Sequence, residues 1–282
     1  MTQDESPLFI QSISNGMSVL FAFSAQQPTM NLAEIAAAAG ISKSAAQRFA
    51  YTFERLGVLR KDPISKRFSL ATRVLDLGCR YLQAHSLLER ANPYLLDLNR
   101  ASGETVNLAE PDGSNMVYIG RFPSPVRSIV HMPIGRPLPM FCTSAGRAYL
   151  SGLPDTEVIR LLDGSPRPKY TEKTVTDLDE LLAIVHGVRE KGYALCVDEY
   201  YRGDIAIGVP LLNLHGEPVA AVNISVSTVH WTVEEALKQL VPQLLETANL
   251  ITTKPPTPSA LSPFNMGYGK NDALGQKTAR RR

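Results

Sequence analysis

The 282-residue sequence has little cysteine, little histidine and no long apolar run, and each shortage excludes a class of protein. Three widely spaced cysteines provide neither a disulfide framework nor a zinc ligand set. The five histidines are scattered singly, so we expect no metal site. No run approaches the roughly 18 to 20 apolar residues that cross a bilayer, and the start, MTQDESPLF, is acidic where a signal peptide is basic. We therefore expect a cytoplasmic protein with no membrane partner.

The common catalytic motifs are also missing. The patterns GxSxG, GxGxxG and HExxH and the P-loop are absent from the sequence. Cys142 could be a nucleophile with His131 or His215 as its base, but a buried thiol beside a helix N-terminus is the commoner arrangement. We therefore expect no catalytic residue, no cofactor and no enzyme activity.

Positive charge is scarce in most of the chain and concentrated in one window, although the net charge is only +2. Residues 1–40 contain three acids and no lysine or arginine, whereas residues 41–70 contain seven bases and two acids. A basic window in a near-neutral chain is typical of a module that contacts phosphates. With 44% apolar residues, the chain as a whole has the composition of a globular protein with a core.

The first 71 residues have the pattern of three helices and a hairpin. Apolar spacing predicts a first helix with Met17 and Phe21 on one face. Asn31 and Glu34 form a capping-box pattern before a second helix, and Ser42 is a favourable N-cap for a third. Two short strands follow in VLRKD and KRFSLA, joined by PIS. Three helices and a basic hairpin predict a winged helix-turn-helix.

The third helix has one side of small apolar residues and one side of long hydrogen-bond donors. In a helix-turn-helix the N-terminal part of the second helix of the motif enters the major groove of DNA. Gln47 can pair with adenine and Arg48 with guanine. The other candidate DNA contacts are Ser42, Lys43, Ser44, Lys61, Lys66 and Arg67. We therefore expect double-stranded DNA as a partner; the alternative is a surface helix with solvated charges, which the local charge excess disfavours.

The remaining chain is predicted to contain a linker helix, an α/β domain and a tail. Residues 8–71 form the predicted DNA-binding domain and residues 72–86 the linker helix. Residues 87–254 mix helices with strands in TVNLAE, NMVYIGRF, SIVHMPIG, IAIGVPLLN and PVAAVNISVS. The Pro-, Gly- and polar-rich composition of residues 255–282 predicts a disordered tail. The expected fold class is α+β.

One face of the last predicted hairpin is suited to a ligand. In PVAAVNISVS, alternation puts Asn223 and Ser225 on one face and the large apolar residues on the other. In the preceding strand, Ala206 and Gly208 share a face and are small, which leaves room for a bound molecule. A face exposed to solvent is an equally good interpretation.

The stretch ISKSAAQRFAYTFERLGVLRKDPISKRFSLATRVLDLG resembles the N-terminal domain of the IclR family of bacterial transcription regulators. SAAQRF and KRFSL resemble the branch that controls catabolism of protocatechuate, 4-hydroxybenzoate and related aromatic acids. The similarity continues through GRPLPMFCTSAGRAYLSGLP and GYALCVDEYYRGDIAIGVPLLNLHGEPVAAVNISVS, and covers about residues 10–252. It implies a winged helix-turn-helix, a linker helix and a GAF-like effector-binding domain, assembled as a homodimer or a dimer of dimers on palindromic operators.

The resemblance also implies an effector pocket. In the family the pocket is lined by the loop that matches Ser144 and Ala145, and by polar positions that match Asn223 and Ser225. This sequence departs from the family at two positions: other members carry an acid where Cys196 stands and a cysteine where Ala206 stands. An aromatic carboxylate also needs a cation. The candidates are Arg121, Arg127, Arg136 and Arg202, of which we favour Arg127 and Arg136.

These observations predict a ligand-responsive, DNA-binding transcription regulator of a catabolic operon, whose effector is a small aromatic carboxylic acid. One alternative is an enzyme acting on a small organic acid and fused to a nucleic-acid-binding module, which predicts turnover of the ligand. A second alternative is a structural DNA-binding protein, which predicts no ligand pocket.

Overall fold

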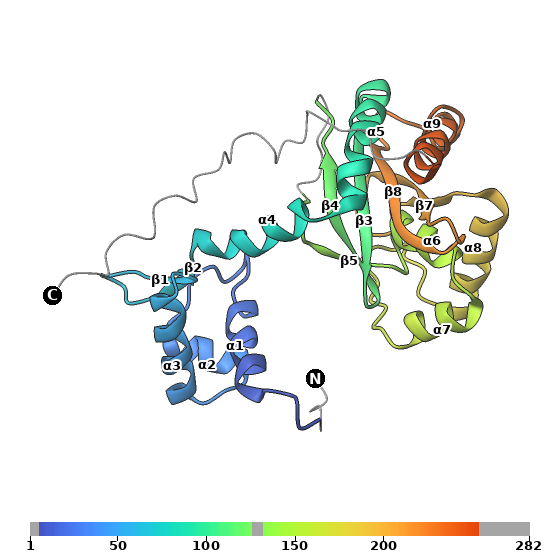
Figure 1. Cartoon of the computed structure of the whole chain (residues 1–282). Helices are drawn as coiled ribbons and strands as arrows, with labels where there is room; N and C mark the ends of the chain where they lie inside the picture. The colour runs from blue at the N-terminus through green and yellow to red at the C-terminus, as the bar shows by residue number, and fades with distance from the viewer. Residues whose placement is uncertain (1–5, 126–131, 254–282) are drawn as a thin grey trace. The chain divides into compact units, whose positions relative to one another are not determined.

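The computed structural model describes residues 6–125 and 132–253. The chain divides into two compact units, Met1–Tyr81 and Leu82–Arg282. In Figure 1 the first unit is helical and coloured mainly blue, and the second is built around a sheet and coloured green to red. The boundary between the units falls within helix α4 (Leu75–Gln83).

The segment predicted as a linker helix over residues 72–86 is helical, and a separate helix follows it, as the sequence also predicted. It begins with a 3-10 turn at Thr72–Val74, continues as α4, and is followed by α5 (Ser86–Ser102). The break has a local cause. The Nδ1 atom of His85 accepts a hydrogen bond from the N–H of Leu88 at 3.2 Å, which caps the start of α5.

The first unit contains three helices and one hairpin: α1 (Gln11–Phe21), α2 (Leu32–Ala39), α3 (Lys43–Arg55), β1 (Leu59–Lys61) and β2 (Phe68–Leu70). The predicted capping box is present, because the Asn31 side chain accepts from the N–H of Glu34 at 3.0 Å and the Glu34 carboxylate accepts from the N–H of Asn31 at 2.8 Å. Gly40 ends α2 with a φ of 66°, which favours glycine. The strands pair antiparallel, with Leu59 opposite Leu70. The winged helix-turn-helix prediction is therefore confirmed.

Helix α1 buries a different face from the one that apolar spacing suggested. Met17 is 41% exposed and Phe21 is 77% exposed, whereas Gly16 and Val19 are buried. Gly16 faces the core because α3 approaches it closely; a Cβ atom at this position would lie 3.3 Å from the ring of Phe53. Met17 and Phe21 therefore remain on the surface of the unit, whereas Leu20, which apolar spacing places on the same face, is half-buried against the core.

The second unit is built on a six-stranded sheet in the order β5-β4-β3-β8-β7-β6, with antiparallel neighbours. Its strands are β3 (Thr105–Asp112), β4 (Asn115–Phe122), β5 (Pro137–Pro139), β6 (Ala194–Val197), β7 (Asp204–Leu212) and β8 (Pro218–Ser227). Its other helices are α6 (Ser144–Ser151), α7 (Asp155–Asp163), α8 (Leu178–Lys191) and α9 (Val233–Thr253). The predicted α+β class is confirmed. Half of the strand predicted in SIVHMPIG, residues 128–131, lies outside the described residues, and its other half, residues 132–135, is not a strand; the nearest strand found is β5.

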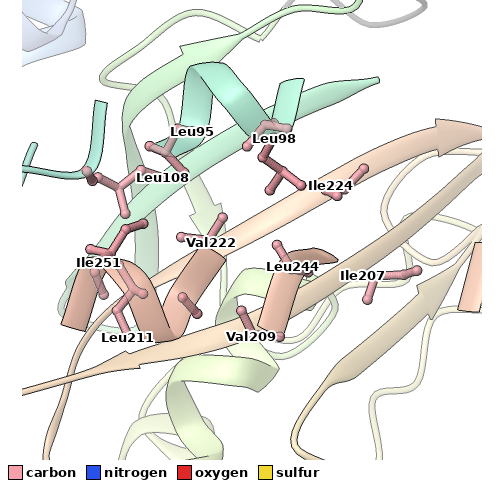
Figure 2. Close-up of a cluster of buried hydrophobic side chains, with 14 of the residues drawn as sticks. Leu95, Leu98, Leu108, Ile207, Val209, Leu211, Val222, Ile224, Leu244 and Ile251 are labelled. Carbon is pink, nitrogen blue, oxygen red and sulfur yellow. The ribbon is translucent and has the colours of Figure 1, made fainter. Parts of the chain in front are cut away.

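One face of this sheet forms the main core together with α5 and α9. Figure 2 shows Leu95 and Leu98 of α5 and Leu244 and Ile251 of α9 in a cluster with strand residues. The strand residues of the cluster include Leu108, Ile207, Val209, Leu211, Val222 and Ile224. Full burial of such a side chain contributes roughly 1.5–3 kcal/mol. The predicted alternation of β8 is thus confirmed on this face, which we call the apolar face.

Within the described parts of the chain, no helix has both the length and the apolar content that are needed to cross a membrane. The same residues contain no group of three His, Cys, Asp or Glu side chains placed to hold a metal ion.

Candidate DNA-binding and effector sites

Helix α3 presents one buried side and one exposed side. Ala46 and Ala50 are fully buried, so the helix packs closely on α2 across the turn at Gly40. The five predicted contact residues of this helix region are all exposed: Ser42, Lys43, Ser44, Gln47 and Arg48. Ser42 is the N-cap, and its Oγ accepts from the N–H of Ala45 at 3.2 Å. This geometry leaves Lys43, Gln47 and Arg48 available to a groove.

Arg67 has an intramolecular role that the sequence did not reveal. Its Nη2 donates to the carbonyl oxygen of Thr29 at 2.7 Å and to Oε2 of Glu34 at 2.7 Å, and its Nε donates to Oγ1 of Thr29. The Glu34 carboxylate is also part of the α2 capping box, and the bond from the N–H of Asn31, followed by Arg67, lowers its pKa. Arg67 therefore fastens the hairpin to α2, and we do not retain it as a candidate phosphate contact.

The two lysines of the hairpin lie on its exposed surface. Lys66 adopts a φ of 58° in the turn, and its Nζ donates to the carbonyl oxygen of Pro63 at 2.7 Å. The Nζ of Lys61 lies 5.3 Å from the centre of the Phe68 ring, which is buried. Both ammonium groups are exposed enough to meet phosphates.

The second face of the sheet, which we call the polar face, brings four predicted effector residues together. In the strand register, Asn223 of β8 lies opposite Asn107 of β3 and Gly208 of β7. One pair along, Ser225 lies opposite Thr105 and Ala206, and Ala206 lies opposite Cys196 of β6. Paired residues of an antiparallel sheet share a face. Asn223, Ser225, Ala206 and Cys196 are therefore neighbours.

Helix α6 lies directly on the polar face and adds the other two residues of the predicted pocket. Ser144 and Ala145, at its N-terminus, are 2% and 1% exposed. A Cβ atom at Gly208 would lie 2.4 Å from the carbonyl oxygen of Ser144, so only glycine permits this approach. Thr143 caps the helix by accepting from the N–H of Gly146 at 3.3 Å. The first turn of α6 thus points its N–H groups toward this region.

Two small cavities lie along the polar face. The first, of about 50 Å³, is lined by residues that include Thr105, Arg121 and Ser227. The second, of about 30 Å³, is lined by residues that include Ser144, Cys196 and Asn223. Five residues border both cavities: Tyr118, Met132, Tyr201, Asp204 and Ser225. These shared side chains divide one polar region into two chambers.

Two buried amides on this face have unsatisfied atoms. Asn107 and Asn223 are each 1% exposed, and neither Nδ2 of Asn107 nor Oδ1 of Asn223 has a hydrogen-bond partner. The Oδ1 atom of Asn107 accepts from Nη1 of Arg121 at 2.9 Å. Leaving a buried polar atom unpaired costs about 1–3 kcal/mol. Such atoms are typical of a site that is completed by something else.

The environment of Cys196 is set by a buried ion pair. Nη2 of Arg147 lies 2.7 Å from Oε2 of Glu199, and Nη1 of Arg147 lies 3.4 Å from Sγ of Cys196. Burial raises the pKa of Cys196 to about 12, although Arg147 acts in the opposite direction. Burial likewise raises the pKa of Cys142. Both thiols are therefore protonated at neutral pH, which gives the nucleophile hypothesis for Cys142 no support.

The structure gives no support to the two favoured arginines as effector contacts. Arg127 lies outside the described residues. Arg136 is exposed just before β5, where its charge acts on Tyr200. Arg121 is the better-placed cation, because it borders the first cavity from β4. Arg202 borders the same cavity but is exposed.

Sequence reasoning also missed residues on the polar face. Tyr118 is almost completely buried, and burial, followed by the charge of Asp204, raises its pKa. Asp204 borders both cavities. One signal was available for Asp204: it occupies the same alternating positions as Ala206 and Gly208 in DIAIGVPLL. No comparable signal indicates Tyr118. It pairs with Ala109 of β3 just beyond a shift in the β3–β4 register, between Leu108 and Ala109, and such a shift cannot be predicted from alternation.

A winged helix-turn-helix followed by a sheet domain with a buried polar face defines a two-domain transcription regulator. The family model for the bacterial transcriptional regulator IclR C-terminal domain matches residues 79–253, and the model for the IclR helix-turn-helix domain matches residues 12–63. The chain belongs to the IclR family of transcriptional regulators. Its first unit is the DNA-binding domain of that family, and its second is the effector domain.

Individual proteins agree with this assignment. The Pca regulon regulatory protein of Pseudomonas putida is 31% identical over 240 residues, which cover 85% of this chain and 82% of the relative. The structure of a transcriptional regulator from Rhodococcus sp. RHA1 matches with 34% identity and a TM-score of 0.76, covering 86% of this chain and 97% of that one. An IclR homologue from Microbacterium hydrocarbonoxydans, solved with 4-hydroxybenzoate, matches with 22% identity and a TM-score of 0.71, covering 86% and 98%, which shows the fold alone.

Proposed function

We propose that this regulator controls a catabolic operon in response to a small aromatic carboxylic acid that binds on the polar face of the effector domain. The observation that carries the proposal is the pair of unsatisfied amide atoms on Asn107 and Asn223, which are paired across the polar face; Asn223 lines the second cavity, next to Ser144 of α6. The aromatic class is supported by the Pca regulon relative and by the 4-hydroxybenzoate complex of a homologue. The proposed function involves no catalysis, and the proposed location is the cytoplasm, where operator DNA lies.

The proposed ligand must rearrange the pocket in order to bind. Pockets for small organic ligands usually measure roughly 300–1,000 Å³, whereas the two cavities measure about 50 and 30 Å³. The shared side chains of Tyr118 and Tyr201 must therefore move apart. A ligand that binds only the opened arrangement shifts the population toward it, by no more than its difference in affinity for the two arrangements. The carboxylate is proposed to meet Arg121 and the N-terminus of α6.

On the DNA side, α3 is proposed to enter the major groove. Gln47 and Arg48 would contact base edges, while Ser42, Lys43, Ser44, Lys61 and Lys66 would contact phosphates or neighbouring bases. Replacing Arg48 by Ala should weaken binding to the specific operator by about 1–3 kcal/mol and leave random DNA nearly unaffected. Lys61→Ala is the matched control, because loss of a phosphate contact weakens both DNAs equally. Equal losses for Arg48→Ala would make Arg48 a phosphate contact only.

A homodimer or a dimer of dimers is proposed as the active form. Large apolar side chains are exposed on α1, including Ile13 and Phe21, and on α4, including Leu75 and Leu77. Contiguous exposed apolar patches mark protein interfaces, and a two-fold dimer matches a palindromic operator. Ile13→Asp and Leu77→Asp should each shift the sedimentation profile toward monomers. Unchanged profiles for both variants would place the interface elsewhere.

A thermal-shift screen of aromatic acids tests the effector class. A ligand at about 100 times its Kd should stabilise the protein by about 2.7 kcal/mol. Operator binding measured with and without each stabilising acid then tests regulation. Chromatographic recovery of the acid separates this function from an enzyme, since a regulator returns its ligand unchanged. Turnover of the acid, or the lack of any stabilising aromatic acid, would overturn the proposal.

A further inference from the structure

Asp204 is the first residue of β7, and its side chain lies on the polar face. It is paired with Ser227 of β8, two positions before Ala206, whereas the next residue, Ile205, points into the apolar core. The residue borders both cavities, so its carboxyl group faces the region in which the proposed effector binds.

The three acids around the β6–β7 hairpin differ in their partners. Asp198 accepts from Nζ of Lys173 at 2.8 Å and from the N–H of Gly203 at 2.6 Å. Glu199 is paired with Arg147. In the described ranges, no cation and no hydrogen-bond donor contacts the carboxyl group of Asp204. Of these three acids, within the described residues, only Asp204 has a carboxyl group without a protein partner.

A half-buried acid without a partner carries a free-energy cost. Asp204 is half-buried at the cavities, and this burial raises its pKa to about 7, with the charge of Asp198 acting in the same direction. Burying an unpaired carboxyl group destabilises a fold unless a ligand or a proton compensates. Perturbed acids that face a cavity are concentrated at functional sites.

The rest of the first cavity indicates what kind of ligand would compensate. Tyr118, Thr105 and Ser225 add neutral hydroxyl groups to its wall, and Arg121 adds a cation from β4. Strands β3 and β8 separate β4 from β7, and the register places Arg121 in line with Gly208, four residues along β7 from Asp204. The Arg121 and Asp204 backbones therefore lie roughly 20 Å apart across the sheet, and their side chains reach the same cavity from opposite ends. A ligand with a carboxylate at one end and a hydroxyl group at the other matches these two ends.

We infer that Asp204 determines effector specificity by accepting a hydrogen bond from a hydroxyl group of the ligand, so that this regulator selects hydroxylated aromatic acids over unhydroxylated ones. The inference rests on the proposed function, because it needs an aromatic acid in this pocket. It assigns a role that none of the positions predicted from the sequence fills. A site built to bind a ligand hydroxyl group leaves its own polar group unpaired when the hydroxyl group is missing, and therefore rejects the analogue.

Calorimetric titration of the full chain with matched acids tests the inference. The probes are 3-hydroxybenzoate, 4-hydroxybenzoate, 3,4-dihydroxybenzoate, 4-methoxybenzoate and benzoate. A hydrogen bond to a charged group changes affinity by roughly 10- to 150-fold. At least one hydroxylated acid should therefore bind ten or more times more tightly than benzoate, and 4-methoxybenzoate, which cannot donate, should bind no better than benzoate.

Variants at position 204 link this preference to the carboxyl group. Asp204→Leu should remove most of the preference while leaving benzoate affinity unchanged or increased. Asp204→Asn, which keeps a neutral acceptor in nearly the same volume, should reduce the preference to a few-fold and serves as the measurement if the leucine variant fails to fold. Asp198→Asn is the matched control, because Asp198 lies in the same hairpin and is already paired; it should keep the full preference.

The outcomes separate this inference from the proposed function. Equal affinity of the wild-type chain for benzoate and all hydroxylated acids would overturn the role of Asp204 and leave an aromatic effector in place. A preference that survives in both Asp204 variants would overturn it equally. If none of the five acids binds, the aromatic effector class fails, and the inference fails with it.

Discussion

The two faces of the effector-domain sheet differ although the same strands build both. On the apolar face, Val222 and Ile224 of β8 are fully buried against α5 and α9. On the polar face, Asn223 is equally buried but has an unsatisfied atom. Both faces bury strand side chains, but within the described residues only the polar face buries strand side chains that carry unsatisfied polar atoms. The comparison teaches that burial by itself does not distinguish a core from a binding site; the distinction is whether the buried groups have partners.

The largest effect is expected on the apolar face. Ile224→Ala should lower the free energy of unfolding by about 2–5 kcal/mol, because it leaves a cavity in a packed cluster. Ser225→Ala, one residue along the same strand, removes only a long hydrogen bond from Nδ2 of Asn223 (3.4 Å) and should lower it by no more than about 1 kcal/mol. Urea unfolding measures both. Similar losses for the two variants would show that the polar face is also a packed core.

The contact between β7 and α6 should show the next largest effect. Gly208→Ala places a Cβ atom 2.4 Å from the carbonyl oxygen of Ser144, so α6 must move away from the sheet. The expected loss is about 1–3 kcal/mol, together with a weaker ligand response. Gly187→Ala in α8 is the control, since a Cβ atom there meets nothing within 4 Å, and it should stabilise by about 0.5–1 kcal/mol. A neutral Gly208→Ala would show that α6 is loosely held.

The pH dependence of stability should reveal the polar face through Asp204. Its pKa is raised to about 7 in the folded protein, so the folded state keeps a proton that the unfolded chain has lost between about pH 4 and pH 7. The free energy of unfolding therefore falls as pH rises through this window. Asp204→Asn removes this dependence. The variant should match the wild type near pH 4 and exceed it at pH 8 by on the order of 2 kcal/mol in urea unfolding.

Other charged and titratable side chains lie near Asp204 and could also make the free energy of unfolding depend on pH. Asp198, Arg121, Arg202, Tyr118 and Tyr201 are the charged or titratable side chains that border the same cavity or act on Asp204. The hydrogen bond from Lys173 holds the pKa of Asp198 below its usual range. Asp198 therefore titrates at lower pH, and its contribution to the free energy of unfolding rises with pH instead of falling. Parallel pH profiles for the wild type and Asp204→Asn would show that Asp204 is ionised throughout.

The smallest change in the free energy of unfolding is expected at Asn223, in the middle of the polar face. Asn223→Leu should weaken binding of the stabilising acid about tenfold or more, since it removes a polar partner and fills space in the pocket. Its effect on the free energy of unfolding should stay within about 1 kcal/mol, because the lost amide was incompletely bonded. Operator binding without ligand should be unchanged. An unaltered ligand affinity would remove Asn223 from the pocket.

Most of the fold was predictable because it depends on local signals. The capping box at Asn31 and Glu34, the glycine end of α2 and the alternation along β8 each act over a few residues, and all three occur in the structure. The break before α5 was predicted to within a few residues, since α4 ends at Gln83 and α5 begins at Ser86, but the cap supplied by the ring of His85 was not. The face of α1 was also misjudged, because Phe53 of a different helix decides it.

The candidate site was predictable only in part. Asn223, Ser225 and Ala206 followed from alternation, and the register places them side by side. Arg67 looked like a phosphate contact until its bonds to Thr29, 38 residues away, were seen. Asp204 and Arg121 lie on strands that are separated by two others, and no local pattern indicates that both reach one cavity. Local sequence patterns therefore do not predict which side chains, far apart in the sequence, line the same cavity.

The interleaving of the two faces has a consequence for engineering biosensors. A strand repeats its side chains with a period of two, so ligand-facing positions can be randomised without touching the positions between them. A library confined to Cys196, Asp204, Ala206 and Ser225 would leave the α5–α9 layer intact. Gly208 should stay fixed, because it sets the height of α6 above the sheet. New inducer specificities are therefore best sought on alternate residues of β6, β7 and β8.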